Sequence, residues 1–294
     1  MITGEHAVVY GHAAIVAAID QRVTVTLVPR TDRRVVIQSD IAPQLEGCLD
    51  KLSIDGVYRF VLAAIACHVS AIPTGFELFI TSDINPTLGL GSSAAVTIAT
   101  LGALTRLADK DTSALHADAL AIVRKLQGRG SGADLAASLS GGMISYRAPI
   151  AEAEAQIAPL PLPEPQLSLK YSGYKTPTGD VLARIAQGAR GKEAEYDALY
   201  ARMGQAAEKA ISTAQVQDWE GFALWLNAYQ ELMAVLGVSD APLERIIREA
   251  RAAPQTRAAK ISGSGLGDCV LALGPPPSGF EDVRIASEGL RVDG

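Results

Sequence analysis

The sequence contains few cysteines, and their spacing fits neither a zinc site nor a disulfide framework. Cys48, Cys67 and Cys269 lie far apart, their number is odd, and the chain has no Cys-x-x-Cys pair. A structural zinc site and a disulfide-stabilised secreted fold are therefore both unexpected. We expect the three cysteines to be reduced, as is usual in a cytoplasmic protein.

A basic N-terminal segment and a long apolar run are also missing. The chain begins Met-Ile-Thr-Gly-Glu-His, which is not the pattern of a signal peptide. The longest apolar segment, residues 57–69, is interrupted by Tyr58, Arg59 and His68, so it is far from the length that spans a bilayer. We therefore expect no membrane partner and a cytoplasmic location.

An excess of positive charge is missing as well. The formal net charge is −6, whereas a nucleic-acid-binding protein normally has a basic face, so we expect no nucleic-acid partner. A small anionic ligand is still compatible with this charge, because a few backbone amides or local cations can bind one. The length of 294 residues favours about two domains, and 48% hydrophobic residues can build a sizeable core.

The pattern of apolar residues places strands and helices in blocks, which favours an α+β fold. We expect strands at residues 23–28, 34–38, 76–81, 143–147, 167–172, 258–262, 269–273 and 283–286. Helices are expected at residues 57–70, 94–108, 113–126, 179–189, 193–216, 219–236 and 243–252. In the helix at 219–236, Trp219, Phe222, Trp225 and Tyr229 share one face, which we expect to pack into the core.

A proline-rich segment, residues 148–166, separates two halves of the chain. Prolines at positions 149, 159, 161, 163 and 165 suit an extended connector and exclude a helix. We therefore expect two domains, residues 1–155 and residues 156–294.

The first of three glycine-rich segments is Pro-Thr-Leu-Gly-Leu-Gly-Ser-Ser-Ala-Ala at residues 86–95. Its glycines allow a ligand to approach the backbone closely, and the free amides of the helix that follows favour a phosphate. Ser92 and Ser93 add hydroxyls for phosphate oxygens or Mg²⁺. A bare Gly-Ser-Ser turn would more often be a capped turn, but the whole run favours phosphate binding. It is neither G-x-x-x-x-G-K-[ST] nor G-x-G-x-x-G, so a dinucleotide-dependent dehydrogenase is disfavoured.

Two further glycine-rich segments follow. Residues 128–134 end in Asp134, which could orient an acceptor hydroxyl and accept its proton, or could simply cap a helix. Residues 260–268 have the sequence Lys-Ile-Ser-Gly-Ser-Gly-Leu-Gly-Asp, which suits either a hairpin loop or a backbone packed against a ligand. Three such segments in one chain indicate a nucleotide together with a second substrate.

These segments resemble the superfamily of galactokinases, homoserine kinases, mevalonate kinases and phosphomevalonate kinases. Residues 4–11, Gly-Glu-His-Ala-Val-Val-Tyr-Gly, resemble the N-terminal motif of mevalonate kinases. Residues 89–95 resemble the phosphate-binding signature, residues 130–134 the loop with the catalytic aspartate, and residues 260–267 the third motif. Residues 171–178 are similar to the strand and turn on the substrate side of mevalonate-type members.

The resemblance implies a two-domain fold with an N-terminal α/β domain like that of ribosomal protein S5 and a C-terminal ferredoxin-like α+β domain. It also implies an enzyme that transfers the γ-phosphoryl group of ATP to the hydroxyl of a small alcohol. Mevalonate is the expected acceptor, ATP and Mg²⁺ are the expected cofactors, and the resemblance allows a homodimer.

The resemblance also implies roles for individual residues. Asp134 would be the catalytic base, and Ser93 would contact the metal. The residues that would bind ATP are Pro86, Gly89, Leu90, Gly91, Ser92, Ser93, Ala94, Gly263, Ser264 and Gly265. The residues that would bind the acceptor are Glu5, His6, Tyr174, Lys175 and Thr176.

The chain departs from the family pattern at three places. Mevalonate kinases usually carry a lysine just before the Gly-Glu-His motif, and this chain begins too late to contain it, so either its true start lies upstream or a cation such as Lys175 substitutes. Val123 occupies the position, eleven residues before Asp134, where a glutamate commonly binds Mg²⁺. Pro86 lies one residue closer to the glycines than usual. A phosphomevalonate or sugar kinase, and a binding protein that has lost catalysis, therefore remain as alternatives.

Overall fold

The structure is a computed structural model that describes residues 1–85, 89–150, 153–164 and 166–293. Its contacts divide the chain into two compact units. Unit 1 contains Met1–Asp20 and Gly142–Ala286, and unit 2 contains Gln21–Gly141 and Ser287–Gly294. The chain passes from one unit to the other near residues 20, 141 and 286. Unit 1 is discontinuous in sequence because its strand at Ala13–Ala17 pairs with the strand at Met143–Arg147. The domain boundary expected at residue 155 stays a prediction.

Unit 2 contains a four-stranded sheet in the order β2-β5-β3-β4. The strands are β2 (Val23–Pro29), β3 (Arg34–Ser39), β4 (Leu45–Cys48) and β5 (Phe76–Ser82). Neighbours are antiparallel except for β3 and β5, which are parallel. Along β5 the residues Phe76, Leu78 and Ile80 are buried and their neighbours are not, which is the alternation of a strand with one face toward a core.

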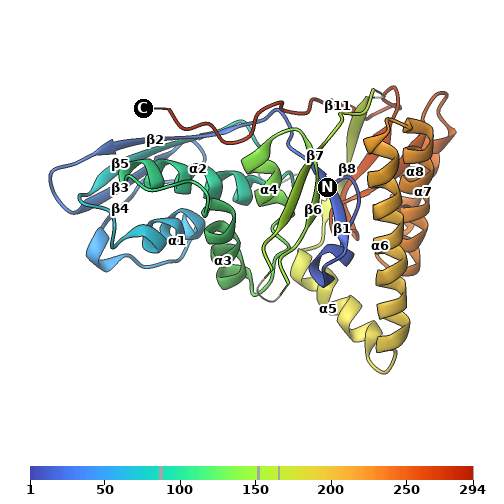
Figure 1. Cartoon of the computed structure of the whole chain (residues 1–294), viewed down its shortest axis with the longest axis horizontal. Coiled ribbons are helices and arrows are strands. Elements are labelled where there is room, and N and C mark those ends of the chain that lie inside the picture. Colours follow the sequence, from blue (N-terminus) through green and yellow to red (C-terminus); the bar gives the residue numbers. More distant parts are fainter. Residues whose placement is uncertain (86–88, 151–152, 165, 294) are drawn as a thin grey trace. The chain divides into compact units, whose positions relative to one another are not determined.

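Four α-helices accompany this sheet in the described residues of unit 2. They are α1 (Arg59–His68), α2 (Ser92–Leu107), α3 (Leu115–Gln127) and α4 (Ala133–Ser140), and Figure 1 shows α1 and α2 beside the sheet. Small residues in α2 allow close packing: a side chain at Gly102 would collide with Leu290 and Val292, which belong to the returning C-terminal segment. The core consists mainly of aliphatic side chains from β3, β5, α1, α2 and α3.

Unit 1 contains two antiparallel sheets. The first has the order β1-β6-β7 and consists of β1 (Ala13–Ala17), β6 (Met143–Arg147) and β7 (Gln156–Leu160). The second has the order β11-β8-β10-β9 and consists of β8 (Leu167–Lys175), β9 (Ala258–Ser262), β10 (Gly267–Leu273) and β11 (Glu281–Val283). All seven residues of β10 are buried, as befits a strand in the middle of a sheet.

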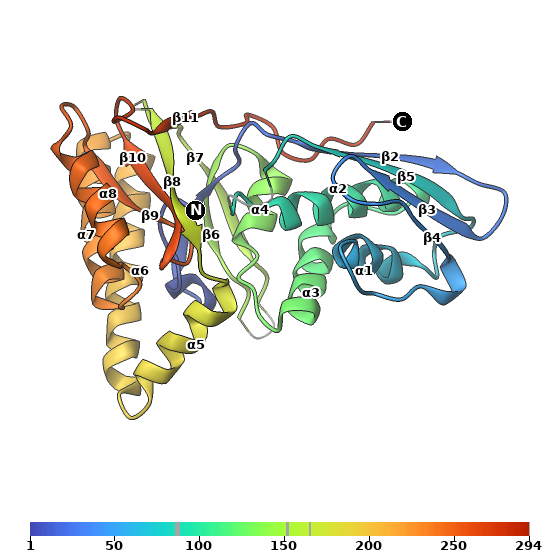
Figure 2. The same cartoon turned by 180° about the vertical axis from the view of Figure 1, so that it is seen from behind.

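The helices of unit 1 are α5 (Thr178–Ala189), α6 (Glu193–Gln215), α7 (Trp219–Val235) and α8 (Ala241–Ala252). Figure 2 shows α7 and α8 alongside the second sheet, and contacts join both helices to β9. Helix α6 packs against α7 and contacts β1 and β7 of the first sheet. Trp219, Phe222 and Tyr229 are buried and Trp225 is half-buried, so the expected apolar face of this helix is confirmed. Asp218 and Asp240 cap α7 and α8 by accepting hydrogen bonds from Gly221 and Leu243.

Two differences from the expected elements concern short segments. The connector expected at residues 148–166 contains β7, and its Pro159 is tolerated because β7 is an edge strand. The strand expected at residues 283–286 is observed as β11, Glu281–Val283, followed by a single bridge between Ile285 and Ile19. In the described part of the chain, no helix has both the length and the apolarity that a membrane crossing requires.

Candidate functional site

The first glycine-rich segment leads directly into α2. Gly91 is the N-cap of this helix and has a left-handed backbone with φ of 84°. The first hydrogen bond of the helix runs from the amide of Ala95 to the carbonyl of Gly91, so the amides between them have no acceptor within the helix. Ser92 and Ser93 in this first turn are half-buried, and Ala94 is buried. This helix start therefore offers amides, two hydroxyls and a positive dipole end to an anion.

The rest of this segment is only partly described. Gly89 is exposed with φ of 69°, Leu90 is half-buried, and Pro86 lies outside the described residues. A Cβ atom added to Gly91 would have no described atom within 4 Å, so open space faces the backbone at the helix start. A triphosphate fits this feature, because glycine allows the phosphate oxygens to reach the amides.

Substitution of Gly91 by alanine is expected to raise the KM for ATP by roughly 10–100-fold, because the methyl group displaces the phosphates from the amides. Left-handed alanine should also reduce stability by about 1–2 kcal/mol. Gly237→Ala is the matched control, since Gly237 also has φ of 84° and open space among the described residues. Steady-state kinetics and thermal melting should show similar destabilisation in both variants and a changed KM in Gly91→Ala alone. Equal KM values would contradict a phosphate site at α2.

Asp134 is the second residue of α4. Gly132 is the N-cap of this helix, so the structure excludes the alternative that Asp134 is the cap. Its Oδ1 accepts a hydrogen bond of 3.0 Å from the amide of Leu135, and the side chain is exposed. Desolvation by the surrounding protein nevertheless raises the pKa of Asp134, and the Leu135 amide opposes this shift. A carboxylate with a raised pKa is a better proton acceptor than an aspartate with an ordinary pKa.

The loop before Asp134 is held by α3. His116 Nε2 lies 3.1 Å from the carbonyl oxygen of Gly132. Val123 is buried, and its Cγ1 would lie 2.8 Å from a Cβ atom at Gly130, so position 130 cannot carry a side chain without movement. The residue at the family's usual glutamate position therefore faces the expected loop but offers no oxygen.

Among the residues of unit 2 that the sequence analysis selected, few offer oxygen ligands to Mg²⁺. The hydroxyl of Ser93 and the carboxylate of Asp134 are suitable hard ligands, whereas Val123 is not. Mg²⁺ usually keeps several waters and binds through one or two protein groups together with substrate phosphates. Ser93 and Asp134 therefore fit an Mg²⁺ ion whose other ligands are water and the phosphates of a nucleotide.

In unit 1, the N-terminal motif is joined to the third glycine-rich segment by a buried ion pair. Lys260 Nζ lies 2.6 Å from Glu5 Oε1, and the exposed fractions of the two side chains are 0% and 3%. Lys260 also donates a hydrogen bond to the carbonyl of Ile261. The Tyr229 hydroxyl donates to the Glu5 carbonyl at 2.7 Å, and its ring lies 5.5 Å from Lys260 Nζ. Burial lowers the pKa of Lys260, and the adjacent Glu5 opposes this shift.

His6 provides the second link to this segment. Its Nε2 lies 2.9 Å from the carbonyl oxygen of Ser264, and only 8% of the residue is exposed. Burial lowers the pKa of His6, which favours a neutral ring that donates to Ser264. Glu5 and His6 thus support the predicted triphosphate loop at Gly263–Gly265, and their contact with the acceptor stays a prediction.

The substrate-side strand β8 ends next to the same loop. Lys175 Nζ lies 3.2 Å from Asp268 Oδ1, and Ser264 donates to the other oxygen of Asp268 at 3.3 Å. The Tyr174 hydroxyl donates at 2.6 Å to Asp240, the cap of α8, and Thr176 is half-buried. Burial and Asp240 raise the pKa of Tyr174. Lys175 is therefore paired with Asp268, while Tyr174 anchors the strand to α8.

Each unit thus gathers part of the predicted site. Unit 2 holds the described phosphate-loop residues and Asp134, and unit 1 holds the other predicted residues that the structure describes. Sequence reasoning missed Lys260, Tyr229 and Asp268 as partners of these residues. Lys260 and Asp268 were visible only as the ends of the third segment, and nothing in the sequence links Tyr229 to Glu5.

Comparisons with known proteins agree with this arrangement. Residues 55–142 match the family model described as GHMP kinases N terminal domain, and residues 207–286 match the model described as GHMP kinases C terminal. The mevalonate kinase of Aeropyrum pernix is 31% identical over 100% of this chain and 95% of its own length. The mevalonate kinase of Pyrococcus horikoshii is 29% identical with the same coverage.

A similar solved structure is that of a Lin0012 protein from Listeria innocua, with a TM-score of 0.85. It covers 97% of this chain and 94% of its own, at 22% identity, and so supports the fold alone. The two family models and the likeness to the Aeropyrum enzyme lead to one assignment. The chain belongs to the GHMP kinases and has their two-domain fold of mixed α and β structure.

Proposed function

We propose that the chain is an ATP-dependent mevalonate kinase, which transfers the γ-phosphoryl group of ATP to the hydroxyl of mevalonate. One observation carries this proposal: the likeness to curated mevalonate kinases extends over the full length of the chain, at 28–31% identity in relatives that it covers almost completely. The expected Gly-Glu-His motif at residues 4–6 supports the same acceptor.

The start of α2 would hold the phosphates of ATP. Its free amides and the hydroxyls of Ser92 and Ser93 supply donors where negative charge has to be stabilised. Ser93 would also hold Mg²⁺, which when bound neutralises charge on the phosphate oxygens. In unit 1, Gly263–Gly265 would support the triphosphate, with His6 fixing the backbone at Ser264.

Asp134 would act on the acceptor. Its exposed carboxylate can accept a hydrogen bond from the acceptor hydroxyl, orient its oxygen toward the γ-phosphorus and take up its proton as the new O–P bond forms. The phosphoryl group then moves directly between substrates, and positioning and charge neutralisation supply the catalysis. Tyr174, Lys175 and Thr176 would line the acceptor side, where Lys175, which pairs with Asp268, would contribute a positive charge.

Release of ADP with a panel of acceptors tests the proposal. The purified chain is mixed with Mg·ATP and mevalonate, phosphomevalonate, homoserine, galactose or no acceptor. We expect mevalonate alone to raise the rate clearly above the rate without acceptor. A preference for phosphomevalonate or galactose would keep the kinase chemistry and replace the acceptor. If ATP binds and no acceptor stimulates ADP release, the chain is a nucleotide-binding member without catalysis.

A further inference from the structure

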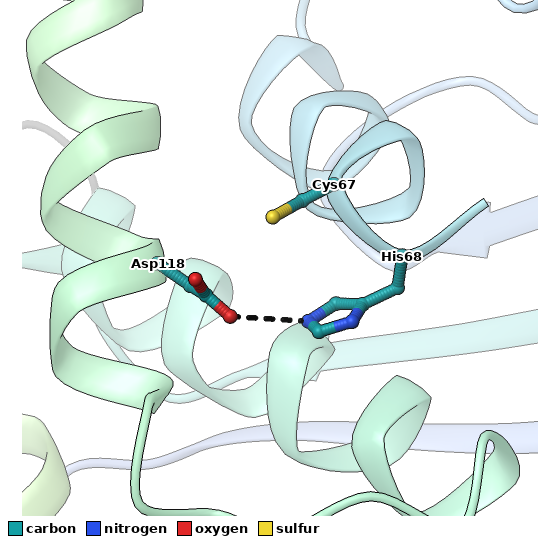
Figure 3. A group of neighbouring side chains, drawn as sticks. All are labelled: Cys67, His68 and Asp118. Carbon is teal, nitrogen blue, oxygen red and sulfur yellow. Dashed lines mark ion pairs between the residues drawn. The ribbon is translucent and has the colours of Figure 1, made fainter. Parts of the chain in front are cut away.

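Three potential metal ligands converge in unit 2, where the end of α1 meets the beginning of α3. Cys67 and His68 are the last two residues of α1, and Asp118 lies in the first turn of α3. The thiol, one ring nitrogen and one carboxylate oxygen all lie within 4.8 Å of one another. Figure 3 shows the ring of His68 and the carboxylate of Asp118 pointing toward each other, with the thiol of Cys67 beside them.

His68 is the member of this cluster that most requires a partner. The residue is 6% exposed, and among the described residues neither ring nitrogen has a hydrogen-bond partner. Its Nε2 lies 3.5 Å from Asp118 Oδ2, which is longer than an ordinary N–H···O hydrogen bond. A buried imidazole without a hydrogen bond carries a desolvation cost, so a bound group at this point would stabilise the fold.

We propose that Cys67, His68 and Asp118 form a binding site for a divalent transition-metal ion of the zinc type. Thiolate, imidazole and carboxylate are the ligands that Zn²⁺ accepts, whereas Mg²⁺ and Ca²⁺ take oxygen ligands. Burial lowers the pKa of His68, which keeps the ring in the neutral form that binds metals. Partial desolvation by neighbouring atoms and the charge of Asp118 raise the pKa of the Cys67 thiol, so binding releases its proton to solvent.

The exposure of the ligands indicates the kind of site. Cys67 is exposed and Asp118 has a side chain that is 32% exposed, so an ion can enter from solvent and keep water as a fourth ligand. Zinc–ligand bonds of about 2.0–2.3 Å require the three side chains to close by roughly 1 Å. Such an ion would join α1 to α3, which pack together in the core of unit 2.

This site is separate from the proposed Mg²⁺ ligand and from the proposed base. Ser93 and Asp134 belong to α2 and α4, whereas the three ligands proposed here belong to α1 and α3. The sequence has no Cys-x-x-Cys pair, and a structural zinc site was therefore unexpected. That pattern, however, detects only sites whose ligands are close in sequence. Asp118 is distant from Cys67 and His68 along the chain, so folding alone creates this cluster.

Cobalt titration of the metal-free, untagged protein without nucleotide tests the proposal. Co²⁺ bound to a thiolate gives a charge-transfer band in the near ultraviolet, which oxygen and nitrogen ligands alone do not give. We expect one equivalent of Co²⁺ to produce this band in the wild-type chain and in the control variant Cys48→Ser, and Zn²⁺ to abolish it by displacement. The band should be missing in Cys67→Ser.

Two further variants test the other ligands. His68→Gln and Asp118→Asn should each weaken Zn²⁺ binding by at least about 10–100-fold in a competition titration. Zn²⁺ should raise the melting temperature of the wild type and of Cys48→Ser, and leave that of Cys67→Ser unchanged. The side chain of Asp118 is partly exposed, so Asp118→Asn should fold. This variant keeps the test valid if His68→Gln does not fold. A wild type without the band, a band that persists in Cys67→Ser, or unchanged affinity in Asp118→Asn would overturn the proposal.

Discussion

Replacing Asp134 with asparagine is expected to lower kcat by about 10²–10⁴-fold, the range that a general acid–base group contributes. The amide cannot take up the proton of the acceptor hydroxyl. It can still accept the hydrogen bond from the Leu135 amide, because that bond uses a single oxygen. The start of α4 should therefore fold unchanged, and the affinity for ATP should remain within a few-fold of the wild type.

The control for this variant is Asp55→Asn. Asp55 is also an exposed aspartate of unit 2 that accepts one local hydrogen bond, from the hydroxyl of Ser53 at 2.7 Å. Single-turnover rates and nucleotide titrations of both variants separate the chemical step from ATP binding. A full rate in Asp134→Asn would contradict the assigned base, and a loss of ATP binding would show that Asp134 acts on the nucleotide instead.

Replacing Lys260 with methionine is expected to lower the free energy of unfolding by about 3–5 kcal/mol, because the carboxylate of Glu5 would remain buried without its cation. The second substitution Glu5→Gln in the same chain should recover part of this loss, since it removes the unpaired charge. The chain has two tryptophans, Trp219 and Trp225, and both lie in unit 1, so tryptophan fluorescence during denaturant titration reports on the unit that contains the pair.

Glu231→Gln provides the comparison for the buried pair. Glu231 is 68% exposed and pairs with Arg251 at 2.9 Å, so its loss should change stability by less than about 1 kcal/mol. The Lys260→Met variant should also raise the KM for ATP, because Glu5 and His6 hold the third glycine-rich segment. If Lys260→Met and Glu231→Gln were equally stable, the buried pair would not organise the N-terminal motif.

The sequence predicted the elements whose residues repeat with a clear period. The alternation along β5 and the aromatic face of α7 both follow from side chains that face one core. β7 was not predicted because its proline is acceptable only at a sheet edge, and the position of a strand within a sheet is a tertiary property. β1 was not predicted because its first four residues are all buried and apolar, so they show no alternation, and β4 has only four residues.

In the candidate site, too, features that depend on neighbouring residues could be predicted, whereas contacts between residues far apart in the sequence could not. A helix start after a glycine-rich segment is local, and the structure places the start of α2 at Ser92, two residues before the expected position. Lys260 and Glu5 are 255 positions apart, so their pairing depends on the fold and could not be inferred from either segment alone. For the same reason the buried partner of Glu5 could not be foreseen, and the contact of Glu5 with the acceptor that the resemblance implies stays a prediction.

The product of the reaction tests the central proposal most directly. The chain is incubated with Mg·ATP and mevalonate, and ADP and phosphorylated mevalonate are quantified by mass spectrometry and ³¹P NMR. For the wild-type chain we predict equal molar amounts of ADP and a mevalonate phosphate ester. The Asp134→Asn variant should form both products far more slowly than the wild type. ADP that accumulates with inorganic phosphate and without the ester would contradict transfer to mevalonate.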